Sequence, residues 1–329
     1  MGFRAFRVSK EDGSIQGKLV ELTIDDLGEG QVIVDALYSS VNYKDALAAT
    51  GKGAILKSFP LVAGIDMAGV VRESLDDRFK PGDEVLITGC GLGETHDGGY
   101  SQTLRVPADW LVPLPDGLSA WEAMGLGTAG FTAAICVHRM LVNGQVPEMG
   151  PIVVTGASGG VGSFAVNIFS SLGFDVLAVS GKPERVDALK ALGAAKVVLP
   201  DELALAKRPL DKALYGGVVD NVGGAILSGL IPHVQLWGNI ASVGLASGPD
   251  LKGTVFPHIL RGVSLLGISS ANCPMPLRRE LWQKLAQEWK PSGLIEIVSE
   301  TAPLTKIADV FDRMMARKTF GRIVVDCRM

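Results

Sequence analysis

Short segments of alternating apolar and polar residues fill the first third of the chain. They are rich in β-branched residues, and glycine, proline and aspartate separate them, as in a series of strands and turns. This pattern predicts a mostly antiparallel, barrel-like β domain. The predicted strands are "RAFRV" (4–8), "LVELTI" (19–24), "QVIVDALYSSVN" (31–42), "AGVVRES" (68–74), "DEVLITG" (83–89) and "SQTLRVP" (101–107).

The pattern changes at Ser119, where helices begin. Ser119 and Glu122 have the spacing of a capping box at a helix start. From Pro151 onward strands and helices alternate, and in one of these helices Pro183 lies near the first turn and Gly193 after the last. Alternation of this kind predicts parallel strands joined by right-handed crossovers, which is a doubly wound sheet.

After about residue 270 the alternation ends. A helix is predicted over 277–290, followed by two more helical or loop segments and a strand in "GRIVVDC" (321–327). We expect this tail to return to the first domain. The predicted fold class is therefore α/β, with a β-rich domain over 1–122 and 271–329 and a doubly wound domain over 123–270.

Composition narrows the kinds of partner. A chain of 329 residues with 47% hydrophobic residues can form two cores. The net charge of −4, without runs of lysine or arginine, argues against nucleic acid and against an anionic membrane surface. We find neither a spanning apolar run nor a leader-like N-terminus, and therefore expect a cytoplasmic protein with small-molecule partners and no membrane association.

The cysteine and histidine residues are dispersed. None of the four cysteines forms a C-x-x-C pair, and the four histidines have no metal-ligand spacing. This distribution favours ordinary reduced thiols over a disulfide framework or a structural zinc site. We therefore expect a mechanism without metal.

A glycine-rich turn lies in "VVTGASGGVGSFAVN" (153–167), directly between a predicted strand and a predicted helix. Its A-x-G-x-x-G spacing, at Ala157, Gly159 and Gly162, is a variant of the dinucleotide-binding fingerprint. Glycine allows the sharp turn and close approach of the backbone, and the N–H groups at the helix start face the phosphates. The alternative is a tight turn with only a structural role.

The end of the next predicted strand indicates which dinucleotide binds. "VSGKPER" (179–185) has Ser180 where an NAD-binding domain carries a carboxylate, and Lys182 and Arg185 follow. Hydroxyl and cationic groups can bind a 2′-phosphate that a carboxylate would repel, so NADPH is favoured over NADH. Alternatively, Lys182 and Arg185 are solvated charges beside Glu184.

The order of a small β domain, a dinucleotide-binding domain and a return to the first domain resembles the medium-chain dehydrogenase/reductase superfamily. That resemblance implies a GroES-like catalytic domain and a Rossmann domain. The zinc enzymes of this superfamily have histidine and glutamate where "VAGIDMAG" has Ile65 and Asp66, and this chain has no four-cysteine lobe. The chain is therefore similar to the zinc-free quinone oxidoreductase and enoyl reductase branches.

Several segments resemble the acrylyl-CoA reductase family of the AcuI/YhdH type. One departure concerns Cys90 and Asp97, where members usually have tryptophan. The segments are "NYKDALAATGKG", "FPLVAGIDMAGVV", "GCGLGETHDGGYSQ", "DWLVPLP", "GTAGFTAA", "ILRGVSLLGISS" and "GRIVV".

The resemblance implies a set of site residues. Tyr43, Asn42 and Asp66 are the catalytic candidates: Tyr43 would contact nicotinamide or substrate, Asn42 would orient a carbonyl, and Asp66 occupies the former zinc-ligand position. The alternatives are a packed aromatic for Tyr43 and a structural cap for Asp66. The cofactor candidates are Tyr43, Thr128, Ser158, Gly159, Gly160, Val161, Ser180, Lys182, Arg185, Gly244, Leu245, Ile268, Ser269 and Arg322.

For Arg322 the alternative is an interdomain salt bridge. We expect a local ion pair between Lys44 and Asp45, and His96 is either an acid or an exposed loop residue. The resemblance implies NADPH-dependent reduction of the C=C bond of acrylyl-CoA, a 2-enoyl-CoA, to propanoyl-CoA.

The main alternative activity is that of an NADPH:quinone oxidoreductase, and a non-catalytic nucleotide-binding protein is a third possibility. For an acyl-CoA substrate, Lys52, Lys57 and Arg278 are candidates to bind the CoA phosphates. Superfamily members also pair edge strands of the cofactor domain, so "VSLLGISS" predicts a homodimer.

Overall fold

The structure is a computed structural model that describes residues 2–329, and its chain forms two compact units. The first unit comprises the chain up to Thr128 together with Ser270–Gln287 and Val298–Met329, and the second comprises Ala129–Ser269 and Glu288–Ile297. The segment 288–297 thus groups with the second unit, whereas the sequence placed it in the first domain. The reason is helix α8 (Leu294–Ile297), which contacts α3 (Gly160–Ser171).

The first unit contains two mostly antiparallel sheets. One has the strand order β2-β1-β4, and the other has the order β15-β16-β3-β5-β6-β8, with β7 also paired to β3. The late strand β16 lies between β15 and β3, which returns the chain to the first sheet system. The strands are β1 (Phe3–Glu11), β2 (Ser14–Leu22), β3 (Val32–Ser40), β4 (Leu61–Val62), β5 (Asp66–Ser74), β6 (Glu84–Thr88), β7 (Thr103–Val106), β8 (Val112–Pro113), β15 (Val298–Pro303) and β16 (Arg322–Asp326).

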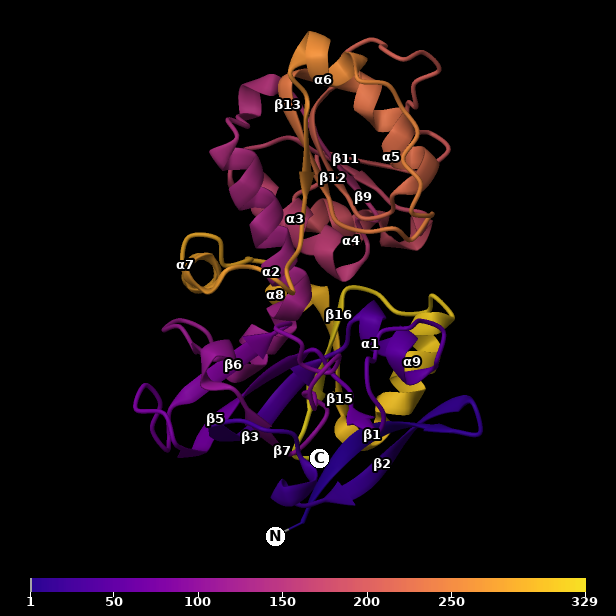
Figure 1. Ribbon diagram of the computed structural model, residues 1–329. Coiled ribbons are helices and arrows are strands. Elements are labelled where there is room, and N and C mark those ends of the chain that lie inside the picture. The colour runs from indigo at the N-terminus through magenta and orange to yellow at the C-terminus, as the bar shows by residue number, and fades with distance from the viewer. Residues whose placement is uncertain (1) are drawn as a thin grey trace. The chain divides into compact units, whose positions relative to one another are not determined.

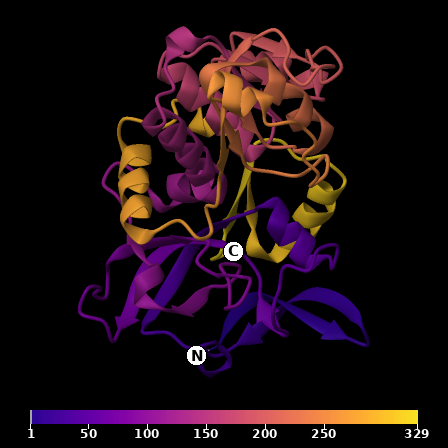
Figure 2. The same ribbon diagram turned by 45° about the horizontal axis from the view of Figure 1, so that its top comes forward.

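Period-two alternation explains why the central strands of this unit are buried on one face. In β3, Val32 and Val34 enter the same core as Met67 of β5. A second core forms where α1 (Tyr43–Ala49) and α9 (Ile307–Met315) pack together, beside each other in Figures 1 and 2. Helix α7 (Met275–Ala286) ends earlier than the predicted 277–290, because Gln287 has a non-helical backbone.

The second unit is built on one parallel sheet with the order β11-β10-β9-β12-β13-β14. Helices lie on both sides of these strands (Figures 1 and 2). The predicted doubly wound sheet is confirmed. The elements are β9 (Ile152–Thr155), β10 (Val176–Val179), α4 (Val186–Ala191), β11 (Lys196–Val198), β12 (Tyr215–Asp220), α5 (Gly224–Leu230), β13 (Val234–Ser242), α6 (Phe256–Arg261) and β14 (Ser264–Gly267).

Helix α2 (Ala120–Val142) begins where the capping box predicted, because the Ser119 N–H and hydroxyl both donate to the Glu122 carboxylate. Within α2, Gly127 interrupts the helical backbone with φ 50° and ψ −156°.

The expectation that no apolar run is long enough to span a bilayer is wrong for α2 by length and composition. The most apolar stretch of α2 is 72% buried inside the protein, and buried core helices of globular proteins have the same length and composition.

Candidate active site

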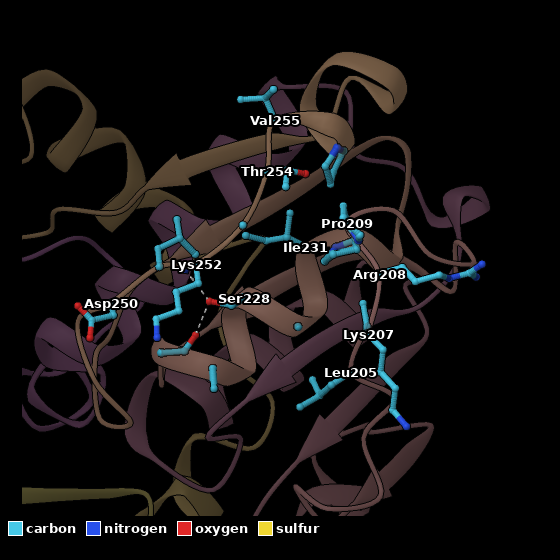
Figure 3. A pocket seen from close by; sticks show the side chains of 18 of the residues that line it. Leu205, Lys207, Arg208, Pro209, Ser228, Ile231, Asp250, Lys252, Thr254 and Val255 are labelled. Atoms are coloured by element: carbon cyan, nitrogen blue, oxygen red, sulfur yellow. Dashed lines mark hydrogen bonds between the residues drawn. The ribbon is translucent and has the colours of Figure 1, made fainter.

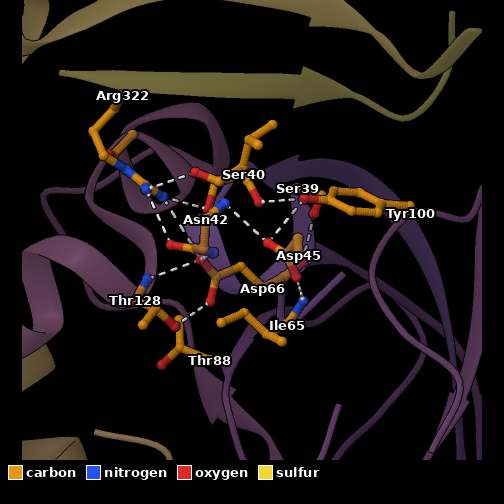
Figure 4. Close-up of polar contacts among 12 residues, drawn as sticks. Ser39, Ser40, Asn42, Asp45, Ile65, Asp66, Thr88, Tyr100, Thr128 and Arg322 are labelled. Atoms are coloured by element: carbon orange, nitrogen blue, oxygen red, sulfur yellow. Dashed lines mark hydrogen bonds and ion pairs between the residues drawn. The ribbon is translucent and has the colours of Figure 1, made fainter. Parts of the chain in front are cut away.

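A polar network in the first unit is centred on Asp66, the first residue of β5, which is completely buried. One carboxylate oxygen, Oδ2, accepts hydrogen bonds from Ser40 Oγ at 2.5 Å, Asn42 Nδ2 at 2.8 Å and the Thr128 N–H at 2.9 Å. The other, Oδ1, accepts from Thr128 Oγ1 at 2.5 Å (Figure 4). Asp66 is therefore fully engaged by protein donors, as a buried carboxylate must be.

Gly127 is the reason why Thr128 can bind Asp66. The break in α2 releases the Thr128 N–H from the helical ladder, so the second part of the helix begins with a donor that points at the carboxylate. A Cβ on Gly127 would lie 2.5 Å from Ser40 Oγ and 2.7 Å from Asp66 Oδ2. Glycine is thus required both by its backbone conformation and by the space around it.

Arg322, at the start of β16, is also part of this network and is only 3% exposed. Its guanidinium group donates to the Val41 carbonyl at 2.9 Å, Asn42 Oδ1 at 3.0 Å and Ser40 Oγ at 2.6 Å, and it lies 3.7 Å from Asp66 Oδ2. Burial lowers its pKa, and the charge of Asp66 opposes this effect. These contacts all lie within the first unit, so we propose a positioning role for Arg322 as an alternative to the expected cofactor contact or interdomain bridge.

Asp45 forms a second buried centre of the same network. Its carboxylate accepts hydrogen bonds from the Asn42 N–H at 2.9 Å, the Ile65 N–H at 3.1 Å and the Tyr100 hydroxyl at 2.9 Å. Burial, followed by repulsion from Asp66, raises the pKa of Asp45 to about 7. The sequence predicted only an ion pair with Lys44 for Asp45, although N-x-x-D at 42–45 is a capping-box spacing that could have indicated its buried role.

The expected ion pair between Lys44 and Asp45 is not present. Lys44 instead binds Glu94, with 2.8 Å between Nζ and Oε1. The reason is helical geometry, because consecutive residues of α1 point in different directions, and Asp45 points into the core while Lys44 points outward.

Tyr43 differs from its neighbours because its side chain is 56% exposed. It is the first residue of α1, directly after the N-cap residue Asn42, whose amide is only 8% exposed and is bound to Asp66 and Arg322. Among the three catalytic candidates, only Tyr43 presents its side chain to solvent. We therefore propose that Asn42 and Asp66 position the start of α1, in place of the direct catalytic roles expected above.

The second unit carries the glycine-rich turn between β9 and α3. Gly156 has φ +59°, and a Cβ on Gly162 would lie 2.7 Å from the Ala157 Cα. Both positions therefore require glycine, and the first N–H groups of α3 remain available to an anion. The local geometry fits the pyrophosphate of a dinucleotide.

The remaining cofactor candidates of this unit follow the carboxyl ends of parallel strands, which meet at one edge of the sheet. Those after β9 and β10 include two hydroxyls in contact, since Ser180 Oγ donates to Ser158 Oγ at 3.0 Å. Leu245 is 67% exposed. The residues at this edge are Ser158, Gly159, Gly160 and Val161 after β9, Ser180 after β10, Gly244 and Leu245 after β13, and Ile268 and Ser269 after β14.

Lys182 and Arg185 lie just beyond Ser180, at the short helical turn that precedes α4. Burial lowers the pKa of Lys182, and the positive charge of Arg185 lowers it further, against the influence of Glu184. Two cations thus influence each other beside a buried hydroxyl. This arrangement suits a dianionic phosphate better than a ribose hydroxyl.

Asn221, after β12, was not predicted. Its N–H donates to Thr155 Oγ1 at 2.9 Å and its Nδ2 donates to the Thr155 carbonyl at 2.7 Å, while its buried Oδ1 has no hydrogen-bond partner. A Cβ on Gly156 would touch the Asn221 side chain. An unsatisfied acceptor beside the glycine-rich turn is a further feature that a bound dinucleotide with hydroxyl or amide donors would satisfy. The signal in the sequence was the polar residue at the strand end in "GVVDNVG".

A separate cavity of about 930 Å³ lies in the second unit along α5 and α6. Lys252 and Ser228 lie beside each other there, and the Lys252 N–H donates to Ser228 Oγ at 3.0 Å (Figure 3). Its lining does not include the predicted cofactor residues. The cavity is therefore distinct from the strand-end site.

Two other candidates have structural surroundings. The ring of His96 packs against Trp110, and its Nε2 donates to the Glu29 carbonyl at 2.7 Å, so we assign it to loop structure. Arg278 is buried and binds backbone oxygens of Ser270 and Ala271, which contradicts a role in binding CoA phosphates at a surface. Lys52 and Lys57 are exposed.

Comparisons with known proteins agree with this architecture. Residues 28–116 match the family model "Alcohol dehydrogenase GroES-like domain", and residues 160–289 match "Zinc-binding dehydrogenase". The name "Zinc-binding dehydrogenase" describes the family as a whole and does not by itself assign zinc to this chain. Among residues 2–329 of this chain, no three His, Cys, Asp or Glu side chains are grouped to hold a metal ion.

Individual relatives match over nearly their full length. The chain is 44% identical to acrylyl-CoA reductase AcuI of Ruegeria pomeroyi, covering 98% of this chain and 99% of the relative. It is 42% identical to the putative quinone oxidoreductase YhfP of Bacillus subtilis, covering 98% of each. The crystal structure of the YhdH oxidoreductase from Salmonella enterica in complex with NADP has a TM-score of 0.95 at 43% identity, covering 98% of this chain and 99% of that one. The chain therefore belongs to the medium-chain dehydrogenase/reductase superfamily, in the branch of the AcuI/YhdH-type acrylyl-CoA reductases.

Proposed function

We propose that this protein is an NADPH-dependent oxidoreductase that reduces the C=C bond of acrylyl-CoA to give propanoyl-CoA. The observation that carries this proposal is 44% identity to an acrylyl-CoA reductase over 98% of the chain. The Escherichia coli relative, also 44% identical, is named a probable acrylyl-CoA reductase. A structural neighbour at 43% identity was crystallised with NADPH.

NADPH, when bound, supplies the hydride for this reaction. The second unit has the groups to hold it. The N–H groups at the start of α3 would bind the pyrophosphate, and Ser180, Lys182 and Arg185 would bind the 2′-phosphate. An acidic residue in place of Ser180 would favour NADH. The absence of a carboxylate at this position favours NADPH.

On the substrate side, we propose that the Tyr43 hydroxyl stabilises the negative charge that develops during the reduction. Reduction at the β-carbon of an unsaturated thioester places negative charge on the thioester oxygen, and a phenol can donate a hydrogen bond there. Asp66, Asn42 and Arg322 are bound to one another and hold the residues that precede Tyr43. The buried network thus fixes the start of α1 and leaves the phenol exposed.

The initial rate of NADPH consumption tests the proposal. The purified protein would be assayed with acrylyl-CoA, crotonyl-CoA and a simple quinone at matched concentrations. We expect the highest kcat/KM for acrylyl-CoA. Turnover of the quinone alone would exclude the acyl-CoA assignment.

A quinone oxidoreductase is the second candidate, and one observation favours it: YhfP of Bacillus subtilis, 42% identical, carries that putative name. The crystal structure of the Bacillus subtilis protein YhfP, at 42% identity, has NAD bound. Both candidate activities use the same nucleotide turn, so only the electron acceptor separates them. The matched-substrate assay distinguishes the two directly.

We also propose that two copies associate through the edge of the parallel sheet. β14 is an edge strand, and Leu265 on it is 38% exposed. Nearby α6 exposes Ile259 at 72% and Leu260 at 60%, and β13 exposes Trp237 at 70%. Exposed apolar side chains beside an edge strand, whose outer flank is open, favour pairing with an identical edge. A cytoplasmic location is proposed as well, and it fits four cysteines that are all unpaired.

A further inference from the structure

Two of the four cysteines are partly exposed and lie in segments that touch each other. Cys90 follows β6, in the loop that begins at Gly89, and Cys273 lies in the turn before α7. The other two, Cys136 and Cys327, are completely buried. The sequence suggested four ordinary thiols, yet the fold brings together the two segments that carry Cys90 and Cys273, from positions far apart in the chain.

Buried Arg278 connects the two segments. Its guanidinium group donates to Thr88 Oγ1 at 3.0 Å, and also to the Ser270 carbonyl at 2.9 Å and the Ala271 carbonyl at 3.1 Å. Three residues from two segments are thereby held on one planar group, a geometry that suits the fork of arginine donors. The end of β6 is fixed against residues 270–271.

Each cysteine lies two residues beyond one of these anchored positions, Cys90 after Thr88 and Cys273 after Ala271. The Cys90 N–H donates to the Ala271 carbonyl at 3.2 Å, and the Cys273 N–H turns back to the Ser270 carbonyl at 3.4 Å. A Cβ on Gly89 would lie 2.8 Å from the Ala271 Cα. The two backbones are therefore in direct contact, with no side chain between them at Gly89.

We propose that Cys90 and Cys273 are a modification site that forms a reversible intramolecular disulfide in the presence of a peroxide. One thiol loses its proton and attacks the peroxide as a thiolate, the O–O bond breaks to give a sulfenic acid and hydroxide, and the released proton converts the hydroxide to water. The second thiol then attacks that sulfur, an S–S bond forms and a second water leaves. Two thiols lose two electrons, and one hydrogen peroxide molecule accepts them.

The surroundings determine how this site depends on pH. Burial raises the pKa of both thiols, and Cys90 raises that of Cys273 further, while the charge of Arg278 opposes both shifts. The thiolate fraction at neutral pH is thus below that of an ordinary cysteine, and oxidation becomes faster as the pH rises. We therefore expect the two cysteines to be oxidised slowly at neutral pH, and only when the protein is exposed to peroxide for a long time.

The bond also has a consequence for activity. The chain passes from the second unit to the first at Ser269–Ser270, just before the segment that the disulfide would tether. A bond to Cys90 restrains this connection. We expect oxidised protein to have a lower kcat, and a thiol reductant to restore it.

The test is peroxide treatment of the whole protein, followed by thiol counting and peptide mapping. We expect two of the four thiols to be lost and a disulfide-linked peptide pair that contains Cys90 and Cys273. Cys90→Ser and Cys273→Ser should each abolish that pair, whereas Cys136→Ala should retain it. Loss of the same two thiols without a linked pair, or a pair that involves other cysteines, would overturn the proposal.

A second measurement needs no variant. Phenylarsine oxide binds stably only where two thiols can reach one arsenic atom. The untreated protein should bind one equivalent, and prior peroxide treatment should prevent this binding. If the folded, reduced protein binds none, the thiols are not close enough and the proposal is wrong.

Discussion

Tyr43 and Asp66 differ in exposure and in hydrogen bonding, and we propose different roles for them on that basis. Asp66 accepts hydrogen bonds on both oxygens and is completely buried, whereas Tyr43 is 56% exposed. A group that is saturated by protein donors has little capacity left for a substrate, and an exposed phenol retains its capacity. At the scale of single residues, exposure therefore distinguishes Tyr43, the catalytic candidate, from Asp66, which we propose holds the start of α1 in place.

Replacing Tyr43 with phenylalanine tests the role of the phenol. Because the ring is kept and only the hydroxyl is lost, we expect kcat with acrylyl-CoA to fall about 100-fold, as when one donor to a developing charge is removed. KM should change less, and the thermal midpoint should stay the same. Tyr38→Phe is the matched control, since the Tyr38 hydroxyl accepts from Arg328 at 2.7 Å. An unchanged kcat in Tyr43→Phe would remove the phenol from the mechanism.

Asp45 gives the fold a pH dependence of its own. Its pKa is raised from 3.8 to about 7 by burial and by Asp66, so between these values the folded state holds a proton that the unfolded state has lost. The contribution of Asp45 to the free energy of unfolding therefore falls as pH rises through this interval. We expect Asp45→Asn to flatten this decline in urea unfolding measured at several pH values. Parallel profiles for the two proteins would contradict the assignment.

At the scale of elements, the break in α2 at Gly127 connects the helix to the Asp66 network. Gly127→Ala places a methyl group 2.5 Å from Ser40 Oγ in a backbone region reserved for glycine, and we expect a loss of about 3 kcal/mol of stability. Gly144→Ala is the control, because Gly144 also has positive φ (+79°) but its Cβ would meet nothing within 4 Å. That variant should lose only about 1 kcal/mol. Equal losses in urea unfolding would show that overlap at Gly127 is unimportant.

The turn after β10 is where we propose that the 2′-phosphate of the dinucleotide binds. If Lys182 binds the 2′-phosphate, Lys182→Ala should raise KM for NADPH about tenfold and leave KM for NADH unchanged, because only NADPH carries that phosphate. Lys190→Ala, an exposed lysine of α4, provides the control. Equal changes in both KM values would indicate a general loss of structure instead.

Much of the element level could be predicted from the sequence because the signals were local. Alternation located β1 and β3, the 119–122 spacing located the start of α2, and glycine spacing located the turn before α3. What was missed depends on contacts between distant segments. Arg322 donates a hydrogen bond to Asn42, which lies 280 positions away in the chain. No local sequence pattern shows that both side chains will be bound in one network.

At the scale of the whole molecule, the exposed apolar residues of α6 predict self-association. Ile259→Asp introduces a charge on a surface that is 72% exposed at this residue, so it should convert a dimer to a chain of 34.6 kDa without unfolding it. Light scattering after size exclusion measures the mass. Leu75→Asp is the control, since Leu75 is 89% exposed and lies in the first unit. A wild-type mass of one chain would exclude the dimer.

The position of β16 between β15 and β3 has a consequence for biosynthesis. The ribosome makes β3 early and β16 only after every strand of the second unit, so the larger sheet of the first unit stays incomplete while the parallel sheet can already form. Until β16 arrives, the flank of β3 that it will cover has open backbone hydrogen-bonding groups, and such edges attract other strands. The nascent chain therefore carries this open edge for as long as the second unit is being made, and a chaperone that shields the edge would act during translation.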